Sequence, residues 1–315
     1  MSDLLRNIDA RTKLAGTNKL EILMFTLGAD RRNGRCETFG INVFKVREVM
    51  RVPSITHAPE MPAAVVGMVS LRGALVPVID LAKYIELQTD AQPGIMIVTE
   101  YNGNTQGFLV EEVDTILRLD WSAMRVPPDM VNARMGGLVT AVTELPDNRL
   151  VMMMDVEKVL AETGSTSNND IAFKAIRPLG IPDRTVFFAD DSAVARKQIE
   201  RTLDAIQVQY VSSINGRLAW EELQKMANYA DSAEMPVSDL IQIILTDVEM
   251  PEMDGYMLTR KIKEDRRFAG IPVLMHTSLS SESNKQLGKA VGVDEYIPKF
   301  DAQKLSQALR RLLSK

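Results

Sequence analysis

Short segments with alternating apolar and polar positions follow one another along roughly the first 160 residues, and turn residues separate them. Such alternation is typical of β-strands with one buried face, and turn pairs such as Arg72-Gly73 favour hairpins. The pattern predicts strands at 20–27, 65–71, 74–79, 94–99, 106–110, 138–142 and 150–154, with short helices at 44–50, 81–86 and 156–162. We therefore expect a mainly antiparallel, all-β domain that forms a barrel or a sandwich.

The pattern changes after residue 184, where short apolar runs alternate with segments of helical spacing. Strands are predicted at 185–189, 208–212, 240–246, 272–276 and 295–298, and helices at 193–205, 217–229, 256–264, 282–291 and 302–313. Five strands and five helices in strict alternation indicate a parallel sheet covered by helices on both faces. The second half of the chain is therefore expected to be a doubly wound α/β domain.

A linker is predicted between the two patterns. Residues 163–170 are small and polar, and Pro178 and Pro182 interrupt the chain soon afterwards. The expected division is a β domain at 18–162, a linker at 163–183 and an α/β domain at 184–314. A chain of 315 residues is long enough for two domains that each bury a core.

Composition excludes several classes of protein. The 37 Lys and Arg residues against 42 Asp and Glu leave a net charge of −5 without a basic cluster, so no nucleic-acid partner is expected. One cysteine, Cys36, permits no internal disulfide, and two histidines make no zinc pattern. Neither a signal peptide nor a run of about 20 apolar residues is present. We expect a cytoplasmic protein without membrane insertion.

Chemically informative side chains follow four of the predicted parallel strands: Asp190, Asp191, Asp247, Thr277 and Lys299. The carboxyl ends of parallel strands lie at one edge of the sheet, so these side chains can meet. Three carboxylates repel one another unless a hard cation binds between them, and Mg²⁺ prefers such oxygen ligands. The pattern predicts that Asp247 accepts a phosphoryl group, that Asp190 and Asp191 hold Mg²⁺, and that Lys299 and Thr277 contact the phosphoryl oxygens.

The second half resembles a response-regulator receiver domain of the CheY type. The resemblance rests on Phe187-Phe-Ala-Asp-Asp-Ser, Ile244-Leu-Thr-Asp-Val-Glu-Met-Pro-Glu-Met-Asp-Gly, Pro272-Val-Leu-Met-His-Thr and Tyr296-Ile-Pro-Lys, and it covers the whole α/β half. It implies a flavodoxin-like sheet of strand order 2-1-3-4-5. It also implies that Asp247 is the phosphoacceptor and a Mg²⁺ ligand, that the Glu249 backbone carbonyl is a further ligand, and that Tyr296 is the switch aromatic.

Two positions depart from the usual receiver pattern. Proline usually follows the lysine directly, whereas here Pro298 precedes Lys299 and Phe300 follows it, which puts the local backbone in question. The second departure is Glu249, an acidic residue two positions after Asp247. We expect it to hinder a hydrolytic water and so to slow the loss of phosphate.

The first half carries no catalytic pattern, and its histidine, His57, is expected to be structural or on the surface. Residues 18–162 resemble the CheW coupling-protein family through Val65-Val-Gly-Met-Val-Ser-Leu-Arg-Gly-Ala-Leu-Val-Pro-Val-Ile-Asp-Leu and Phe39-Gly-Ile-Asn-Val-Phe-Lys-Val-Arg-Glu-Val. The resemblance implies two small five-stranded β-barrels that bind chemoreceptor tips and a CheA-type histidine kinase. Val46, Glu48 and Arg72 are candidate contacts, although a core role for Val46 and a solvated turn at Arg72 remain equally open.

A CheW-like domain followed by a receiver is the architecture of CheV proteins. The resemblance implies a non-enzymatic chemotaxis scaffold, recruited to receptor arrays, whose coupling of receptor to kinase is modulated by phosphorylation of Asp247, either for adaptation or as a phosphate sink. Its receiver would catalyse its own phosphotransfer and dephosphorylation. A Mg²⁺-dependent phosphatase is the rival, but the Asp-x-Asp motif of such enzymes is missing at Asp247. A transcription regulator is disfavoured, because no helix-turn-helix pattern is present.

Overall fold

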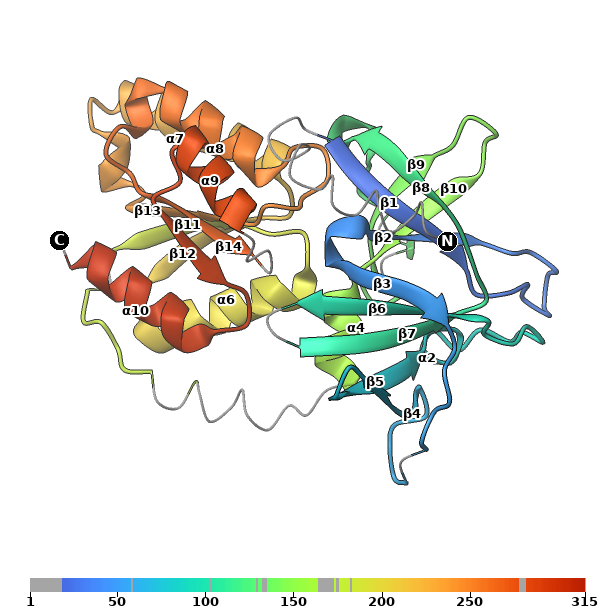
Figure 1. Cartoon of the computed structure of the whole chain (residues 1–315). Helices are drawn as coiled ribbons and strands as arrows, with labels where there is room; N and C mark the ends of the chain where they lie inside the picture. The colour runs from blue at the N-terminus through green and yellow to red at the C-terminus, as the bar shows by residue number, and fades with distance from the viewer. Residues whose placement is uncertain are drawn as a thin grey trace. The chain divides into compact units, whose positions relative to one another are not determined.

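The computed structural model describes residues 19–57, 59–101, 104–128, 130–131, 135–163, 173, 176–181, 183–277 and 282–314. Their backbone forms two compact units that divide between residues 164 and 165 (Figure 1). Much of the predicted linker lies outside the described residues, so its limits at 163–183 stay a prediction. None of the helices in the described part of the chain combines the length and the apolar character that a membrane crossing requires.

The first unit contains two five-stranded sheets. One has the order β8-β1-β2-β10-β9 and the other the order β3-β6-β7-β5-β4. Neighbouring strands are antiparallel except for the parallel pairs β2–β10 and β5–β7. The strands are β1 (Lys19–Thr26), β2 (Thr38–Asn42), β3 (Val46–Arg51), β4 (Val65–Leu71), β5 (Ala74–Asp80), β6 (Ile95–Tyr101), β7 (Asn104–Val110), β8 (Glu112–Asp120), β9 (Val139–Glu144) and β10 (Leu150–Met154).

Both sheets contribute to one apolar core. Phe25 of β1, Ile79 of β5 and Phe108 of β7 are buried in the same cluster. The short helices α2 (Leu81–Tyr84) and α4 (Val156–Thr163) close this core, and the 3-10 turns η2 (Val43–Lys45) and η3 (Trp121–Ala123) link strands. The expectation of five strands per sheet around a shared core is therefore confirmed.

The helix predicted at 44–50 is wrong. Residues 43–45 make a single 3-10 turn, and Val46–Arg51 is strand β3, which pairs with β6. Val46, Val49 and Met50 have the spacing of a helical face, which misleads a pattern of this length. Pairing with the neighbouring strand overrides that local preference, as is common in sheets. Strands β2 and β8 were not predicted either, and only the sheet pairings reveal them.

The second unit is an α/β domain with one five-stranded sheet. The strands are β11 (Thr185–Ala189), β12 (Gln209–Ser213), β13 (Ile243–Thr246), β14 (Val273–Thr277) and β15 (Glu295–Pro298). Every pairing is parallel, and the order β12-β11-β13-β14-β15 is the predicted order 2-1-3-4-5.

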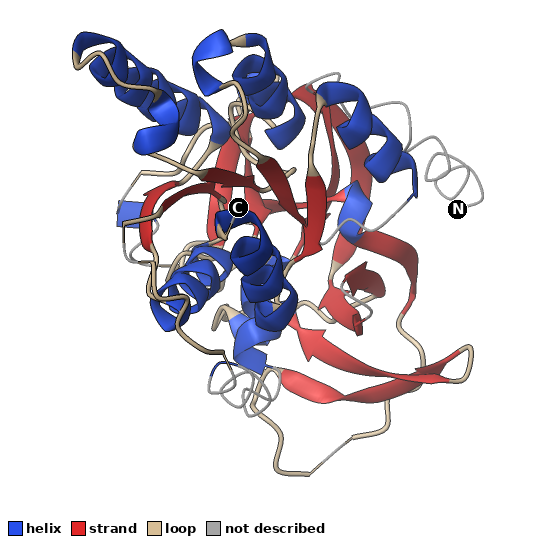
Figure 2. Ribbon diagram, turned by 90° about the vertical axis from the view of Figure 1, so that its left-hand side faces the viewer, coloured by secondary structure: helices blue, strands red, loops and turns tan. Residues whose placement is uncertain are grey.

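Helices cover both faces of this sheet (Figures 1 and 2). They are α6 (Ala193–Ile206), α7 (Gly216–Ser232), α8 (Gly255–Glu264), α9 (Glu282–Val291) and α10 (Ala302–Leu313), with the 3-10 turns η4 (Val237–Asp239) and η5 (Arg266–Phe268). Phe188 of β11 packs with residues of α6 and α10 on one face, and the adjacent Phe187 packs with residues of α7 and α8 on the other. Alternation along the strand thus builds two cores, which leaves the carboxyl edge of the sheet for polar side chains.

Candidate functional site

The carboxyl edge of the parallel sheet brings together the charged residues that follow β11, β13 and β15. The Lys299 Nζ atom lies 3.0 Å from Asp190 Oδ2 and 2.9 Å from Asp247 Oδ2. The Lys299 side chain is 1% exposed and that of Asp190 is 0% exposed. An ammonium so placed compensates two buried carboxylates that would otherwise repel each other.

Backbone contacts hold the loop that carries Asp190 and Asp191. The Ser192 N–H donates to Asp190 Oδ1 at 2.9 Å, and the Ser192 hydroxyl oxygen accepts from Ala195 N–H at the start of α6. Arg196 of the same helix donates from Nη1 to the carbonyl oxygens of Asp190 and Asp191, at 2.9 Å each. The first turn of α6 therefore positions both acidic residues.

Asp247 is equally well held. Its Oδ1 accepts from Val248 N–H at 2.6 Å, and its carbonyl oxygen accepts from the Thr246 hydroxyl at 2.9 Å. A Cβ atom built on Gly255 would overlap that carbonyl oxygen, so the start of α8 can pack here only as glycine. The spacing between Asp247 and Gly255 in the sequence thus reflects a close approach of two backbones.

The acidic groups suit a hard divalent cation. Oxygen atoms of Asp190, Asp191 and Asp247 lie within 4.8 Å of one another, and Asp191 is partly exposed. Burial raises the pKa of Asp190, but the Lys299 ammonium and the His276 imidazole outweigh burial and lower that pKa to about 2. The carboxyl is therefore ionised at neutral pH. Three carboxylates and one ammonium leave a surplus of negative charge, which fits Mg²⁺ with its preference for oxygen ligands.

The remaining predicted residues of this half lie around the same edge. Thr277 ends β14 and is buried, and its carbonyl oxygen accepts from Lys299 N–H at 3.2 Å. Glu249 is buried in the loop after β13. Tyr296 of β15 is half-buried, and its side chain lies against α9, where a Cβ atom on Gly288 would overlap the phenol. A hydrogen bond joins Tyr296 to Tyr256 of α8, and burial raises the pKa of Tyr296.

The unusual order of Pro298 and Lys299 does not displace the lysine. Pro298 is the last residue of β15 and pairs with Thr277. Phe300, which stands where receivers usually have proline, has a φ of 62°. Proline fixes φ near −65°, so it could not adopt this conformation. Phe300, with its left-handed backbone, turns the chain toward α10, and Lys299 still reaches the carboxylates of Asp190 and Asp247.

In the first unit, two of the three predicted contact residues lie together. Arg72 Nη2 donates to Glu48 Oε2 at 3.0 Å, which joins the β4–β5 turn to β3, and the Arg72 side chain is 72% exposed. Arg72 and Gly73 have φ values of 50° and 84°, the signs of a type I′ hairpin turn, in which arginine is uncommon. Val46 is 2% exposed and belongs to the shared core. Its side chain is therefore structural and offers no exposed surface to a partner.

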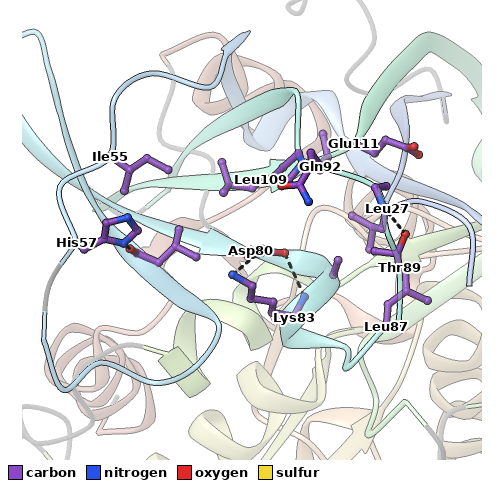
Figure 3. Close-up of a pocket in the computed structure, with 15 residues that line it drawn as sticks. Leu27, Ile55, His57, Asp80, Lys83, Leu87, Thr89, Gln92, Leu109 and Glu111 are labelled. Carbon is purple, nitrogen blue, oxygen red and sulfur yellow. Dashed lines mark hydrogen bonds and ion pairs between the residues drawn. The ribbon is translucent and has the colours of Figure 1, made fainter. Parts of the chain in front are cut away.

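A pocket of about 360 Å³ in the first unit was not predicted (Figure 3). Its walls come from the residue after β1, the loop before β4, β4 itself, the end of β5 with helix α2, the segment that follows this helix, and the end of β7. Lys83 contacts Asp80 on one wall, and His57 lies apart from them, where its ring bonds the Val66 carbonyl. Since segments far apart in the sequence form the walls, no local sequence signal marks them. Glu48 and Arg72 are not among the residues that line it.

Comparisons with known proteins agree with both halves. The model of the CheW-like domain family matches residues 21–164, and that of the response regulator receiver domain matches residues 186–310. Chemotaxis protein CheV3 of Helicobacter pylori is 29% identical over 88% of this chain and 89% of its own length. CheV1 of the same organism is 27% identical over 99% of each chain. Chemotaxis protein CheY1 of Helicobacter pylori is 32% identical over 39% of this chain and 92% of its own length.

The fold, the acidic cluster with its lysine at the carboxyl edge of the sheet, and the family matches define a chemotaxis signalling protein made of a CheW-like β domain and a CheY-like receiver. The chain belongs to the CheV-type chemotaxis coupling proteins, in which these two domains are fused. Membership of this type makes it a signalling scaffold rather than a metabolic enzyme.

Proposed function

We propose that the receiver accepts a phosphoryl group on Asp247 and that this modification adjusts how the CheW-like domain couples chemoreceptor tips to a CheA-type histidine kinase. The observation that supports it most strongly is the contact of one buried lysine with two of three clustered carboxylates. The scaffold would be cytoplasmic and recruited to receptor arrays.

In the proposed reaction, Asp247 Oδ2 attacks the phosphorus atom of a phosphohistidine, so a new O–P bond forms as the N–P bond breaks. Lys299 lies 2.9 Å from this oxygen and can follow the charge onto the phosphoryl oxygens. Asp190, Asp191, Asp247 and the Glu249 carbonyl would hold Mg²⁺, which when bound supplies further neutralising charge. The Thr277 hydroxyl would donate to a phosphoryl oxygen.

The structural effect of phosphorylation would be transmitted to the protein surface through β14 and β15. Thr277 stands at the end of β14, and Tyr296 lies on the neighbouring strand against α9. A shift of the Thr277 hydroxyl toward phosphate would change the packing around Tyr296. If this region has one packing arrangement without phosphate and another with it, the charge added at Asp247 would change the surface around Tyr296.

On the first unit, the exposed Arg72 and its ion-pair partner Glu48 are the proposed contact with the kinase or receptor. Arg72 keeps a backbone conformation that asparagine or glycine would adopt at lower cost. This strain favours a role for the guanidinium beyond making the turn. The Arg72 side chain is 72% exposed and that of Glu48 is 20% exposed, so solvent screens the ion pair and its contribution to stability is about 1 kcal/mol or less.

The experiment is phosphorylation of the full chain by acetyl phosphate or by a phosphorylated kinase, followed on a phosphate-affinity gel. Wild type should gain one phosphoryl group in a Mg²⁺-dependent reaction. Asp247→Asn should gain none, and Asp231→Asn, a change of an exposed receiver aspartate, should behave as wild type. Labelling of Asp247→Asn at the wild-type level would reject the assignment.

Reconstituted receptor, kinase and scaffold then test the coupling. Kinase activity should depend on the scaffold and should change when Asp247 is phosphorylated, and the direction of that change separates the possible adaptation modes. A phosphate sink would instead drain the kinase without altering its activity. Equal effects of wild type and Asp247→Ala, with and without phosphodonor, would exclude regulation through this site.

Phosphate loss gives a further test of the site. Glu249 is buried two residues beyond the phosphoacceptor, and its side chain is proposed to hinder a hydrolytic water. Glu249→Ala should therefore release phosphate faster than wild type does. Equal or slower release from the variant would remove this role.

A further inference from the structure

His276 is a buried histidine beside the acidic site. It lies on β14 directly before Thr277 and is 2% exposed. Two residues earlier on the same face, Leu274 packs into the apolar core between the sheet, α6 and α10. Burying an imidazole among apolar side chains is costly unless it interacts with a polar group. Asp190 is an acidic neighbour of this imidazole.

The position of His276 relative to Asp190 is specific. His276 Nδ1 lies 4.0 Å from Asp190 Oδ2, the oxygen that forms an ion pair with Lys299 Nζ at 3.0 Å. The other oxygen, Oδ1, accepts from Ser192 N–H. A separation of 4.0 Å is too long for a hydrogen bond, so the ammonium is the nearer donor to Oδ2 in this arrangement.

We infer that His276 is a positioning residue that holds Asp190 Oδ2 when Lys299 moves to the phosphoryl group. This inference rests on the proposed function. Lys299 contacts Asp190 and Asp247 together and cannot keep both contacts while it follows charge onto phosphate. An approach of about 1 Å by the imidazole would give Oδ2 a hydrogen bond from Nδ1–H.

The consequence concerns the orientation of a predicted metal ligand. A buried carboxylate oxygen that loses its ion-pair partner carries a desolvation cost, and the group can then rotate away from the metal. A hydrogen bond from His276 Nδ1–H would hold the carboxylate in its orientation. Groups that orient metal ligands in this way typically change metal affinity about 10-fold to 100-fold when they are removed.

Three substitutions at His276 separate donation from packing. His276→Leu keeps an apolar side chain without a donor. His276→Asn places an amide nitrogen near the Nδ1 position, whereas His276→Gln places one near Nε2. Met275→Leu, a volume-conserving change on the opposite face of β14, is the matched control.

The full chain is titrated with MgCl₂ by isothermal titration calorimetry in the presence of beryllium fluoride, a phosphoryl mimic that should draw Lys299 away from Asp190, and unfolding is measured without Mg²⁺. His276→Leu and His276→Gln should weaken Mg²⁺ binding about 10-fold or more, and His276→Asn should stay within about 3-fold of wild type. Phosphorylation by acetyl phosphate at saturating Mg²⁺ should follow the same ranking. Met275→Leu should match wild type.

Equal Mg²⁺ affinity of wild type, His276→Leu and His276→Gln would overturn the inference. Affinity lost equally by His276→Asn and His276→Leu would assign the residue to packing alone. If His276→Leu does not fold without Mg²⁺, the Mg²⁺ affinities of His276→Asn and His276→Gln are compared instead, and equal affinities would overturn the inference. A wild-type protein that neither binds Mg²⁺ nor accepts phosphate would reject the proposed function itself. If wild type and His276→Leu both bind Mg²⁺ and accept phosphate equally well, only the inference about His276 is rejected.

Discussion

Replacing Lys299 by methionine removes the ammonium between two buried carboxylates and keeps most of the side-chain volume. The lysine is 1% exposed, so solvent screens its contacts of 2.9 and 3.0 Å very little. Removing one partner of a buried ion pair typically costs about 3–5 kcal/mol. Lys299→Met should therefore lower the free energy of unfolding of the receiver by about 3–5 kcal/mol at pH 7 without Mg²⁺.

The pH dependence of stability at acidic pH should also weaken. In wild type, the pKa of Asp190 is lowered from 3.8 to about 2, so this carboxyl stabilises the fold above pH 3.8, by about 2 kcal/mol, and the contribution is lost as pH falls toward 2. Without the ammonium, burial, which raises that pKa, is opposed by His276 but no longer by Lys299, so less of this stabilisation should remain. The stability of the variant should therefore fall less than that of wild type between pH 4 and pH 2, and Mg²⁺ should restore part of the stability lost at pH 7.

Urea unfolding of the full chain measures both effects. A Trp121→Phe background leaves Trp220 of α7 as the fluorescent reporter of the receiver. Lys304→Met, a change of a lysine that is 65% exposed and pairs with Asp301, is the control and should stay within about 0.5 kcal/mol of wild type. If Lys299→Met unfolded at the wild-type urea concentration at pH 7, and its stability fell as steeply as that of wild type between pH 4 and 2, the ion pair would not stabilise the site.

Three further substitutions have defined outcomes. Gly255→Ala should destabilise the receiver by about 3 kcal/mol or more in the same fluorescence assay, because its Cβ overlaps the Asp247 carbonyl oxygen; a stable variant would contradict that packing. Gly288→Ala should push the Tyr296 phenol outward and increase its nitration by tetranitromethane, whereas an unchanged nitration rate would show that the phenol does not need this space. Arg72→Asn should keep or raise stability by up to about 1 kcal/mol, because asparagine suits the left-handed turn position, while weakening kinase or receptor binding; full binding would remove Arg72 from the interface.

Sequence pattern alone determined most of the receiver. Strict alternation of strands and helices required a parallel sheet, and the residues that follow its strands had to meet at one edge whatever the detailed packing. Asp190, Asp247 and Lys299 could therefore be selected before any coordinates. The ends of β15 and α10 were predicted to the residue, because Pro298 and the cap Asp301 mark them locally.

Tertiary structure decided the features that depend on distant neighbours. Residues 46–51 became a strand through pairing with β6, and that pairing buried Val46 while it left the Glu48–Arg72 pair accessible. A two-residue periodicity says which residues share a face, but it does not say which strand lies alongside.

The same holds for the acidic site. The sequence placed His276 within an apolar run that predicts a buried strand, and nothing distinguished it there. Only the fold brings its imidazole close to Asp190, which follows a strand two positions away in the sheet. The local chain thus determined which charged groups meet at the sheet edge. The packing of neighbouring strands determined which buried groups surround them, because those distances depend on contacts between residues far apart in sequence.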